Sequence, residues 1–168
     1  MIRRLTPADA DAFYRLRLLG LETSPEAFAT VAAAWRAASP ERAGAALQSA
    51  VEGRFVLGAF EGNDLVGQVG VKREGRPSVR HKAGVWGLVV HPDHRRRGTG
   101  ARLLQAAIDE ARACEGLHYL RAVVTVSGDA IRLFESAGFV RYGMEAGGLR
   151  IGDAAHDQAF LRFELVAP

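Results

Sequence analysis

Apolar residues recur every three or four positions through the N-terminal third of the chain, and this spacing predicts helices. The segment Thr6–Asp9 supplies an N-cap residue, a proline for the first helical position and an acidic residue at the third. Ser24-Pro25 and Ser39-Pro40 repeat this start signal, so alanine-rich helical segments are expected out to about Val51. A short apolar stretch, Ile2–Leu5, precedes them.

Apolar runs replace the helical spacing from Arg54 onward, which predicts strands. The runs FVLGAF and LVGQVGVKR flank the turn residues EGND and predict a hairpin. The polar segment Glu74–Lys82 is expected to be a loop, and the apolar run Gly84–Val90 a buried strand. A helix with one buried face is expected after Gly100. Its apolar residues are Leu103, Leu104, Ala107, Ile108 and Ala111.

The C-terminal part of the chain predicts a strand, a short helix and two further strands. These elements are Tyr119–Val126, Asp129–Ser136, Phe139–Glu145 and Gln158–Val166. Gly138 is well placed to end the helix in a left-handed cap, and the glycine-rich stretch GGLRIGDAAHD separates the last two strands. The predicted order is therefore β-α-α-β-β-β-α-β-α-β-β, without repeats or linkers.

The composition is that of one compact domain. With 168 residues, 48% of them hydrophobic, the chain can bury a core of its own, so one domain over residues 1–168 is expected. The single cysteine, Cys114, excludes an internal disulfide and has no second cysteine with which to form a metal-binding motif. The charged N-terminus lacks the apolar core of a signal peptide, and no window has the length of a membrane span. We therefore expect a cytoplasmic protein with no metal and no membrane partner.

The formal net charge is +3, and much of it comes from arginine. A mild positive excess suits a small anionic ligand and is too weak to indicate nucleic acid. Binding of nucleic acid is therefore a rival interpretation that we do not expect to hold.

Three consecutive arginines stand directly before two glycines and a predicted helix. The segment Arg95–Gly100 reads RRRGTG and follows a strand that ends in Val90–Pro92. The first N–H groups of a helix lack intrahelical acceptors and lie at the positive end of its dipole, so added positive charge indicates a bound anion. The dinucleotide-binding motif G-x-G-x-x-G is excluded, because position 103 is Leu103 where the motif needs glycine. The P-loop motif is excluded as well, because no GK[ST] follows. The pattern predicts a pyrophosphate-binding loop; the alternative is a solvated basic helix start whose glycines only form a turn.

These residues resemble the signature of the GNAT family of acyl-CoA-dependent N-acyltransferases. The family's Gln/Arg-x-x-Gly-x-Gly/Ala behind a strand ending in V-x-P is matched by Arg95–Gly100 behind Val90–Pro92. A second segment, Ser127–Phe139, is similar to the family's Asn-x-x-Ala-x-x-Leu-Tyr-x-x-x-Gly-Phe. The order of elements agrees along nearly the whole chain. The resemblance implies an α/β (α+β) GNAT fold, with a mixed central sheet of about seven strands flanked by about four helices.

The resemblance also implies acetyl-CoA as cosubstrate. The backbone of Leu88–Val90 would pair with the pantetheine arm, and the amides from Arg95 to Gly100, up to Ala101, would bind the diphosphate. Arg96 and Arg97 are expected either at the outer phosphates or exposed to solvent. The complete set implied for acetyl-CoA binding is Leu88, Val89, Val90, Arg95, Arg96, Arg97, Gly98, Thr99, Gly100, Ala101, Ser127 and Phe134.

Two residues depart from the family pattern. Ser127 stands where the family often has asparagine, and Phe134 stands where it often has the tyrosine that protonates the departing thiolate. A thiol with a pKa of about 8.5 is a tolerable leaving group near neutral pH, so water, Ser127 or Tyr142 could replace that acid.

The general base is open at this point. Many members carry a carboxylate on the strand before the loop, yet Gly84–His91 contains neither Asp nor Glu. The candidates from elsewhere are His81, Glu74, Glu145, His156 and Asp157, whereas His94 and His118 are expected in a solvent-facing turn and a loop. The alternative for each is an exposed loop residue or a structural hydrogen-bonding group. The predicted catalytic set is His81, Glu145 and Ser127.

The resemblance predicts transfer of an acetyl group to a primary amine of a small molecule or peptide, by direct attack in a ternary complex. The alternative is a non-catalytic acyl-CoA-binding or regulatory domain. The segments Ala27–Ala38 and Glu41–Val51 are expected to border the acceptor site, and Trp86 either borders it or packs in the core. A homodimer is compatible with these observations.

Overall fold

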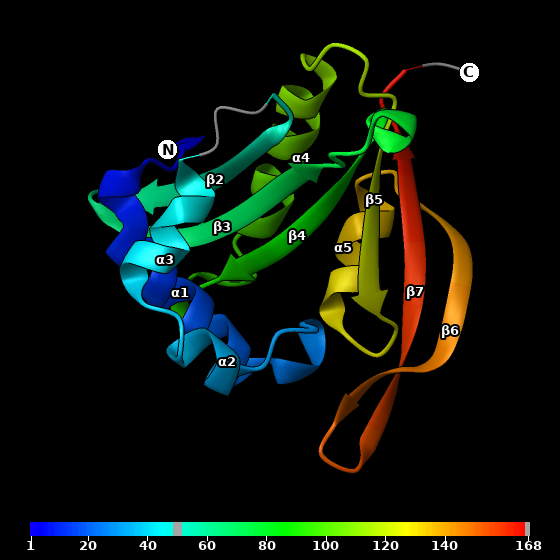
Figure 1. The fold of residues 1–168 in the computed structure, drawn as a ribbon. Coiled ribbons are helices and arrows are strands. Elements are labelled where there is room, and N and C mark those ends of the chain that lie inside the picture. Colours follow the sequence, from blue (N-terminus) through cyan, green and yellow to red (C-terminus); the bar gives the residue numbers. More distant parts are fainter. Residues whose placement is uncertain (49–51, 167–168) are drawn as a thin grey trace.

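The computed structural model describes residues 1–48 and 52–166 and contains one seven-stranded mixed sheet (Figure 1). The strand order is β1-β2-β3-β4-β5-β7-β6, and every neighbouring pair is antiparallel except β4 with β5. The strands are β1 (Ile2–Arg4), β2 (Arg54–Glu61), β3 (Asp64–Arg73), β4 (Lys82–Val90), β5 (Tyr119–Thr125), β6 (Val140–Ile151) and β7 (Ala154–Glu164). The helices are α1 (Ala10–Thr23), α2 (Ala32–Arg36), α3 (Pro40–Gly44), α4 (Thr99–Arg112) and α5 (Asp129–Ser136).

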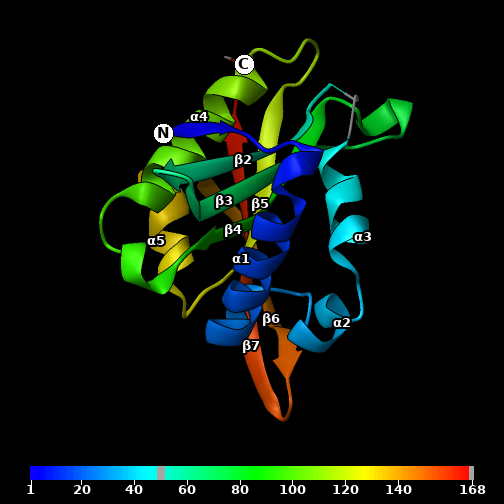
Figure 2. The ribbon, with the colours of Figure 1, turned by 90° about the vertical axis from the view of Figure 1, so that its left-hand side faces the viewer.

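Helices cover both faces of this sheet (Figure 2). On one face, α1 packs on β3 and β4, and α3 packs beside α1, around a small core that includes Phe13, Val56 and Phe60. On the other face, α4 and α5 pack on β2 to β5 around the larger core. The predicted buried side of α4 is confirmed, because all five of its apolar residues named above are fully buried.

The alanine-rich helices are shorter than the sequence predicts. Ser24-Pro25 opens only a 3₁₀ turn, η2 (Pro25–Ala27), and the helical segment expected over Ala27–Ala38 is reduced to α2. A further turn, η3 (Ala45–Leu47), follows α3, and the expected helix end at Val51 falls outside the described residues. Isolated helices of five residues gain little from propensity alone, so tertiary packing sets their length.

The prediction that GGLRIGDAAHD separates two short strands is wrong. β6 and β7 run through this stretch and turn at Gly152 and Asp153, forming the long hairpin at the lower right of Figure 1. Most of β6 is exposed, so it carries no alternation of apolar and polar residues that would identify a strand.

β4 and β5 pair only at their beginnings. The parallel register joins Lys82 to Tyr119, Ala83 to Leu120 and Gly84 to Arg121, and no later pair follows between the described strands. Beyond Gly84, β4 remains bonded to β3 alone, and its register shifts where Gly87 adopts a positive φ of 63°. The second half of β4 thus has an open backbone edge that faces β5.

Gly70 on β3 provides a place for the indole of Trp86 on β4, with which it is paired. A Cβ at Gly70 would lie 2.1 Å from Cε2 of Trp86. We expect Gly70→Val to lower the free energy of unfolding by about 2 kcal/mol because the indole must leave its position. For a chain of this size the melting temperature should fall by about 6 °C.

Gly84→Val is the matched control for Gly70→Val, because a Cβ at Gly84 meets nothing within 4 Å. Thermal unfolding of both variants compares the same change on neighbouring strands. Equal melting temperatures for the two variants would contradict the prediction, because they would show that the indole of Trp86 moves without loss of stability.

Candidate active site

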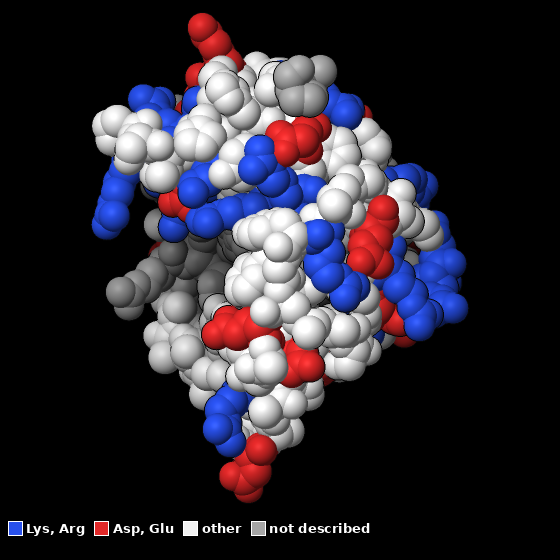
Figure 3. Space-filling model, turned by 90° about the vertical axis from the view of Figure 1, so that its right-hand side faces the viewer, with Lys and Arg blue, Asp and Glu red and all other residues white. Residues whose placement is uncertain are grey.

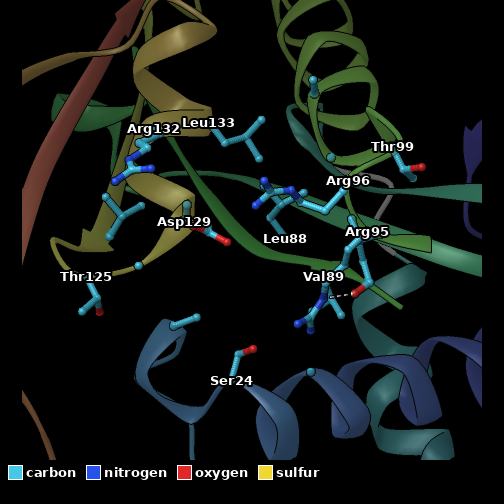
Figure 4. A pocket seen from close by; sticks show the side chains of 18 of the residues that line it. Ser24, Leu88, Val89, Arg95, Arg96, Thr99, Thr125, Asp129, Arg132 and Leu133 are labelled. Atoms are coloured by element: carbon cyan, nitrogen blue, oxygen red, sulfur yellow. Dashed lines mark hydrogen bonds between the residues drawn. The ribbon is translucent and has the colours of Figure 1, made fainter. Parts of the chain in front are cut away.

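A pocket of about 550 Å³ opens where β4 and β5 separate (Figure 4). One wall is the end of β4 with the loop and first turn of α4. The opposite wall is the end of β5 with α5, and the end of α1 with η2 covers the third side. The pocket exists because the open edge of β4 and two helix starts meet at the same point.

The loop before α4 presents free backbone donors to this pocket. Gly98 caps α4 in the left-handed region with a φ of 76°, and Arg102 is the first residue to donate a helical hydrogen bond, to the Gly98 carbonyl at 3.0 Å. The amides of Thr99, Gly100 and Ala101 therefore have no intrahelical acceptor, and all three residues line the pocket. Three free donors at the positive end of a helix dipole are suited to bind an anion.

The three loop arginines differ in position. Arg95 lines the pocket, but its Nε donates to the Val90 carbonyl at 3.0 Å and its Nη2 to Thr23 Oγ1 at 3.2 Å. Arg96 extends toward α5 in Figure 4 and has a positive φ of 61°, which is unusual for a residue with a Cβ. Arg97 is exposed and does not line the pocket. Arg95 thus holds the loop against β4 and α1, and Arg96 is the loop arginine that faces the cavity.

Leu88, Val89 and Val90 line the pocket along the open edge of β4. The side chain of Val89 packs against α1, since a Cβ at Gly20 would lie 2.8 Å from its methyl carbons. Across the pocket, Thr125 Oγ1 donates to the Glu26 carbonyl and fastens η2 to β5. The backbone of β4 therefore borders a narrow channel that η2 covers.

His81 and Glu74 do not belong to this pocket. His81 precedes β4 and packs against the rings of His118 and Tyr119, and Glu74 forms an ion pair with Arg121. β4 rises about 3.3 Å per residue, so its start lies roughly 20 Å from Leu88. His81, a predicted catalytic residue, is therefore separated from this pocket by most of β4.

Two further residues of the predicted set lie outside the pocket lining. Ser127 is exposed in the turn after β5, although Thr125 and Gly128 on either side of it line the cavity. Phe134 is only 4% exposed and packs edge-on against Phe139 in the core. Its neighbour on α5, Leu133, lines the pocket instead.

The remaining candidates belong to the β6–β7 hairpin. Glu145 is exposed and pairs with Gln158, and Tyr142 on the same strand is 61% exposed. His156 is half-buried opposite Leu149, and Asp157 accepts a hydrogen bond from the Gly147 amide at 2.8 Å. None of these four lines the pocket, so their local contacts are those of a hairpin.

Four charged or titratable residues that the sequence analysis did not place here line the pocket. Glu26 comes from η2, His94 from the loop, and Asp129 and Arg132 from α5. Asp129 points into the cavity in Figure 4. For Asp129 and Arg132, the one available sequence signal was their position on the polar face of the predicted helix 129–136. Glu26 reaches the site because η2 packs across the end of β5. The sequence around Glu26 does not indicate this tertiary position.

Three other features would also indicate a function in the described part of the chain: a metal site, a membrane-spanning helix and a continuous positive surface. Within residues 1–48 and 52–166, no three His, Cys, Asp or Glu residues are grouped so that they could hold a metal ion. No described helix has the length and apolar character needed to cross a membrane. In Figure 3, Lys and Arg side chains are interspersed with Asp and Glu side chains on the face shown, rather than forming one positive surface.

Comparison with known proteins points to one family. The model of the acetyltransferase (GNAT) family matches residues 21–139. The N-alpha-acetyltransferase RimI of Mycobacterium tuberculosis is 37% identical over 99 residues, which are 58% of this chain and 60% of RimI. The L-amino acid N-acyltransferase MnaT of Escherichia coli is 46% identical over 66 residues, which are 39% of this chain and 35% of MnaT. The chain thus aligns with only part of each of these relatives.

Similarity to solved structures extends along the full chain. The structure of yncA, described as a putative acetyltransferase from Salmonella typhimurium with its cofactor acetyl-CoA, superimposes with a TM-score of 0.85. It is 26% identical, and the match covers 100% of this chain and 96% of that one. The mixed seven-stranded sheet expected from the sequence is therefore confirmed.

Proposed function

Because the chain belongs to the GNAT family of acetyltransferases, we propose that it transfers the acetyl group of acetyl-CoA to a primary amine by direct attack in a ternary complex. The observation that carries this proposal is the joining of an anion-binding helix start to the open edge of β4. A ligand with a diphosphate at one end and an amide-bearing arm at the other needs both features in one channel.

The residues of the pocket fit acetyl-CoA. The free amides of Thr99, Gly100 and Ala101 are suited to the diphosphate, with Arg96 and Arg132 available as charged partners from the two walls. On the edge that faces β5, Leu88–Val90 has no partner among the described strands and offers backbone hydrogen bonds to the pantetheine amides. Acetyl-CoA would supply the thioester carbonyl, and we propose that backbone amides of β4 next to Gly87 stabilise the charge on its oxygen.

We assign proton removal from the amine to Glu26. Of the two carboxylates that line the pocket, Glu26 lies on η2, two residues from Phe28, whereas Asp129 lies at the N-terminus of α5. Glu26 directly precedes the segment Ala27–Ala38, which is expected to border the acceptor amine. A carboxylate there can take the proton that the amine must lose before it attacks. The departing thiolate needs no strong acid, since its pKa of about 8.5 allows water to protonate it.

Acetyl-CoA should stabilise the protein against heat. At a concentration of one hundred times the Kd, binding adds about 2.7 kcal/mol to the free energy of unfolding, which differential scanning fluorimetry detects easily. Adenosine and NAD should stabilise much less, because they lack the pantetheine arm. Absence of binding at millimolar acetyl-CoA in calorimetry would contradict the assignment of the pocket.

Turnover is tested by thiol release from acetyl-CoA over a panel of amines. The thiol reagent should meet little background from the protein, since its one cysteine, Cys114, is buried. Binding of acetyl-CoA without thiol release for any amine would instead support a non-catalytic acyl-CoA-binding domain.

A further inference from the structure

Arg17 is a buried cation, two of whose three nitrogens have no hydrogen-bond partner among the described residues. It lies on α1, is 7% exposed, and its Nε and Nη1 atoms make no hydrogen bond although they are shielded from solvent. Burial lowers the pKa of Arg17 to about 10, so the side chain keeps its charge at neutral pH. A buried charge without a counter-charge is costly, so the unsatisfied donors of Arg17 call for a partner that the described residues do not supply.

Three aromatic rings surround this guanidinium. Its central carbon lies 5.6 Å from the ring centre of Phe28, 5.2 Å from that of Trp35 and 5.3 Å from that of Trp86. Ring faces attract the cation, yet they offer no oxygen acceptor to its N–H groups. The rings therefore position Arg17 without satisfying it.

Arg17 lines a second pocket, of about 650 Å³, on the α1 side of the sheet. The indole Nε1 of Trp86, which lines the same pocket, is also buried without a hydrogen-bond partner. Arg54 and Lys72 add positive charge to the lining, and no Asp or Glu among the described residues lines it. The pocket thus combines unsatisfied donors with positive charge.

The second pocket adjoins the acetyl-CoA pocket at two residues. Nη1 of Arg17 lies 2.5 Å from the place where a Cβ at Gly87 would be, so it rests directly against the bulge in β4. Leu88, the next residue, lines the first pocket, and so does Phe28, which contacts the guanidinium. A ligand held by Arg17 would therefore lie beside the part of β4 next to Gly87, where we propose that the thioester binds.

We propose that Arg17 binds a carboxylate of the acceptor, so that the acceptors are amines that also carry a carboxylate, such as amino acids. This inference rests on the proposed function and specifies its substrate class. A carboxylate supplies two acceptor oxygens in the geometry of the guanidinium fork, and its charge compensates the buried cation.

The test compares amines that differ only in this group. Thiol release from acetyl-CoA is measured for a panel of L-amino acids and for the corresponding L-amino acid carboxamides. We expect kcat/KM for the best amino acid to exceed that for its carboxamide by at least tenfold. Arg17→Met retains much of the apolar stem and removes the charge and the donors, so it should abolish this preference while leaving the Kd for acetyl-CoA unchanged.

Two control variants separate binding from structure. Arg15→Met changes an exposed arginine on the same helix and should alter neither the preference nor the melting temperature. Arg17→Lys keeps the charge without the fork and should restore only part of the preference. If the amino acid and its carboxamide react equally, or if Arg17→Met keeps the preference, the carboxylate site is wrong.

The proposed function and the carboxylate site can fail independently. Thiol release with carboxylate-free amines alone would support the transferase and overturn the site. If no amine releases thiol, thermal shifts in the presence of coenzyme A decide the second question. Stabilisation by amino acids that Arg17→Met removes would support the site and overturn the transferase, whereas no stabilisation would overturn both.

Discussion

Glu26→Gln is expected to lower kcat by about a hundredfold or more, the usual contribution of a general base, while the Kd for acetyl-CoA stays unchanged. The glutamine keeps the size of the side chain and its place on η2, so the bond from Thr125 to the residue 26 carbonyl should persist. What it loses is the ability to accept a proton from the amine. Initial rates at saturating acetyl-CoA, with binding measured by calorimetry, give both quantities.

Asp129→Asn is the matched control for Glu26→Gln, since Asp129 is the other carboxylate that lines the pocket. Its position at the start of α5 favours a negative charge, so a small loss of stability and little loss of kcat are expected. If Asp129→Asn lowered kcat strongly and Glu26→Gln did not, the base would be Asp129 and the assignment of Glu26 would be wrong.

Gly100→Val is expected to weaken acetyl-CoA binding by on the order of a hundredfold or more, since two or three charge-assisted hydrogen bonds contribute roughly 1.5–3 kcal/mol each. A Cβ at this position would lie 3.2 Å from Cδ2 of Leu133 and 3.7 Å from Cγ2 of Val90. Both residues line the pocket, so the valine methyl groups would occupy the space between the first turn of α4 and α5. Calorimetry with acetyl-CoA measures the loss.

Thermal unfolding without ligand shows whether Gly100→Val acts on the pocket alone. Gln105→Val places the same β-branched residue at an exposed position of α4 and controls for its helix propensity. A folded Gly100→Val protein with unchanged affinity would mean that the RRRGTG segment is only a turn.

The sequence predicted the parts of the site that are continuous in the chain. The end of β4, the loop and the first turn of α4 follow one another from Leu88 to Ala101, and the structure places them in one pocket. Their order gives a strand end, a left-handed glycine and a helix start, each of which has a local signal. The roles of the arginines inside this stretch were not predictable, because the bonds of Arg95 to Val90 and Thr23 depend on where α1 lies.

The lining residues that come from elsewhere in the chain were not named from the sequence. His81 is close to β4 in sequence, yet it lies at the opposite end of that strand from the pocket. Glu26 is more than sixty positions from Leu88, yet both line the same cavity, because α1 crosses β4 where Gly20 meets Val89. Helix crossings of this kind are set by the packing of small residues against large ones, which periodicity does not encode.

The fold was predicted best where one face of an element is buried. The apolar face of α4 gave its position and orientation, whereas β6 gave no signal because both of its faces are largely exposed. Trp86 packs in the core against Phe13, one of the two expectations made for it, and it also lines the second pocket.

The separation of β4 from β5 also bears on self-association. An unpaired strand edge is a template on which another chain can add a strand, and exposed edges are therefore aggregation hazards. Here the free edge faces inward: η2 is fastened across it by Thr125, and α5 forms the opposite wall. Because these elements flank the edge, it is not presented on an outer side of the sheet where a strand of another chain could pair with it.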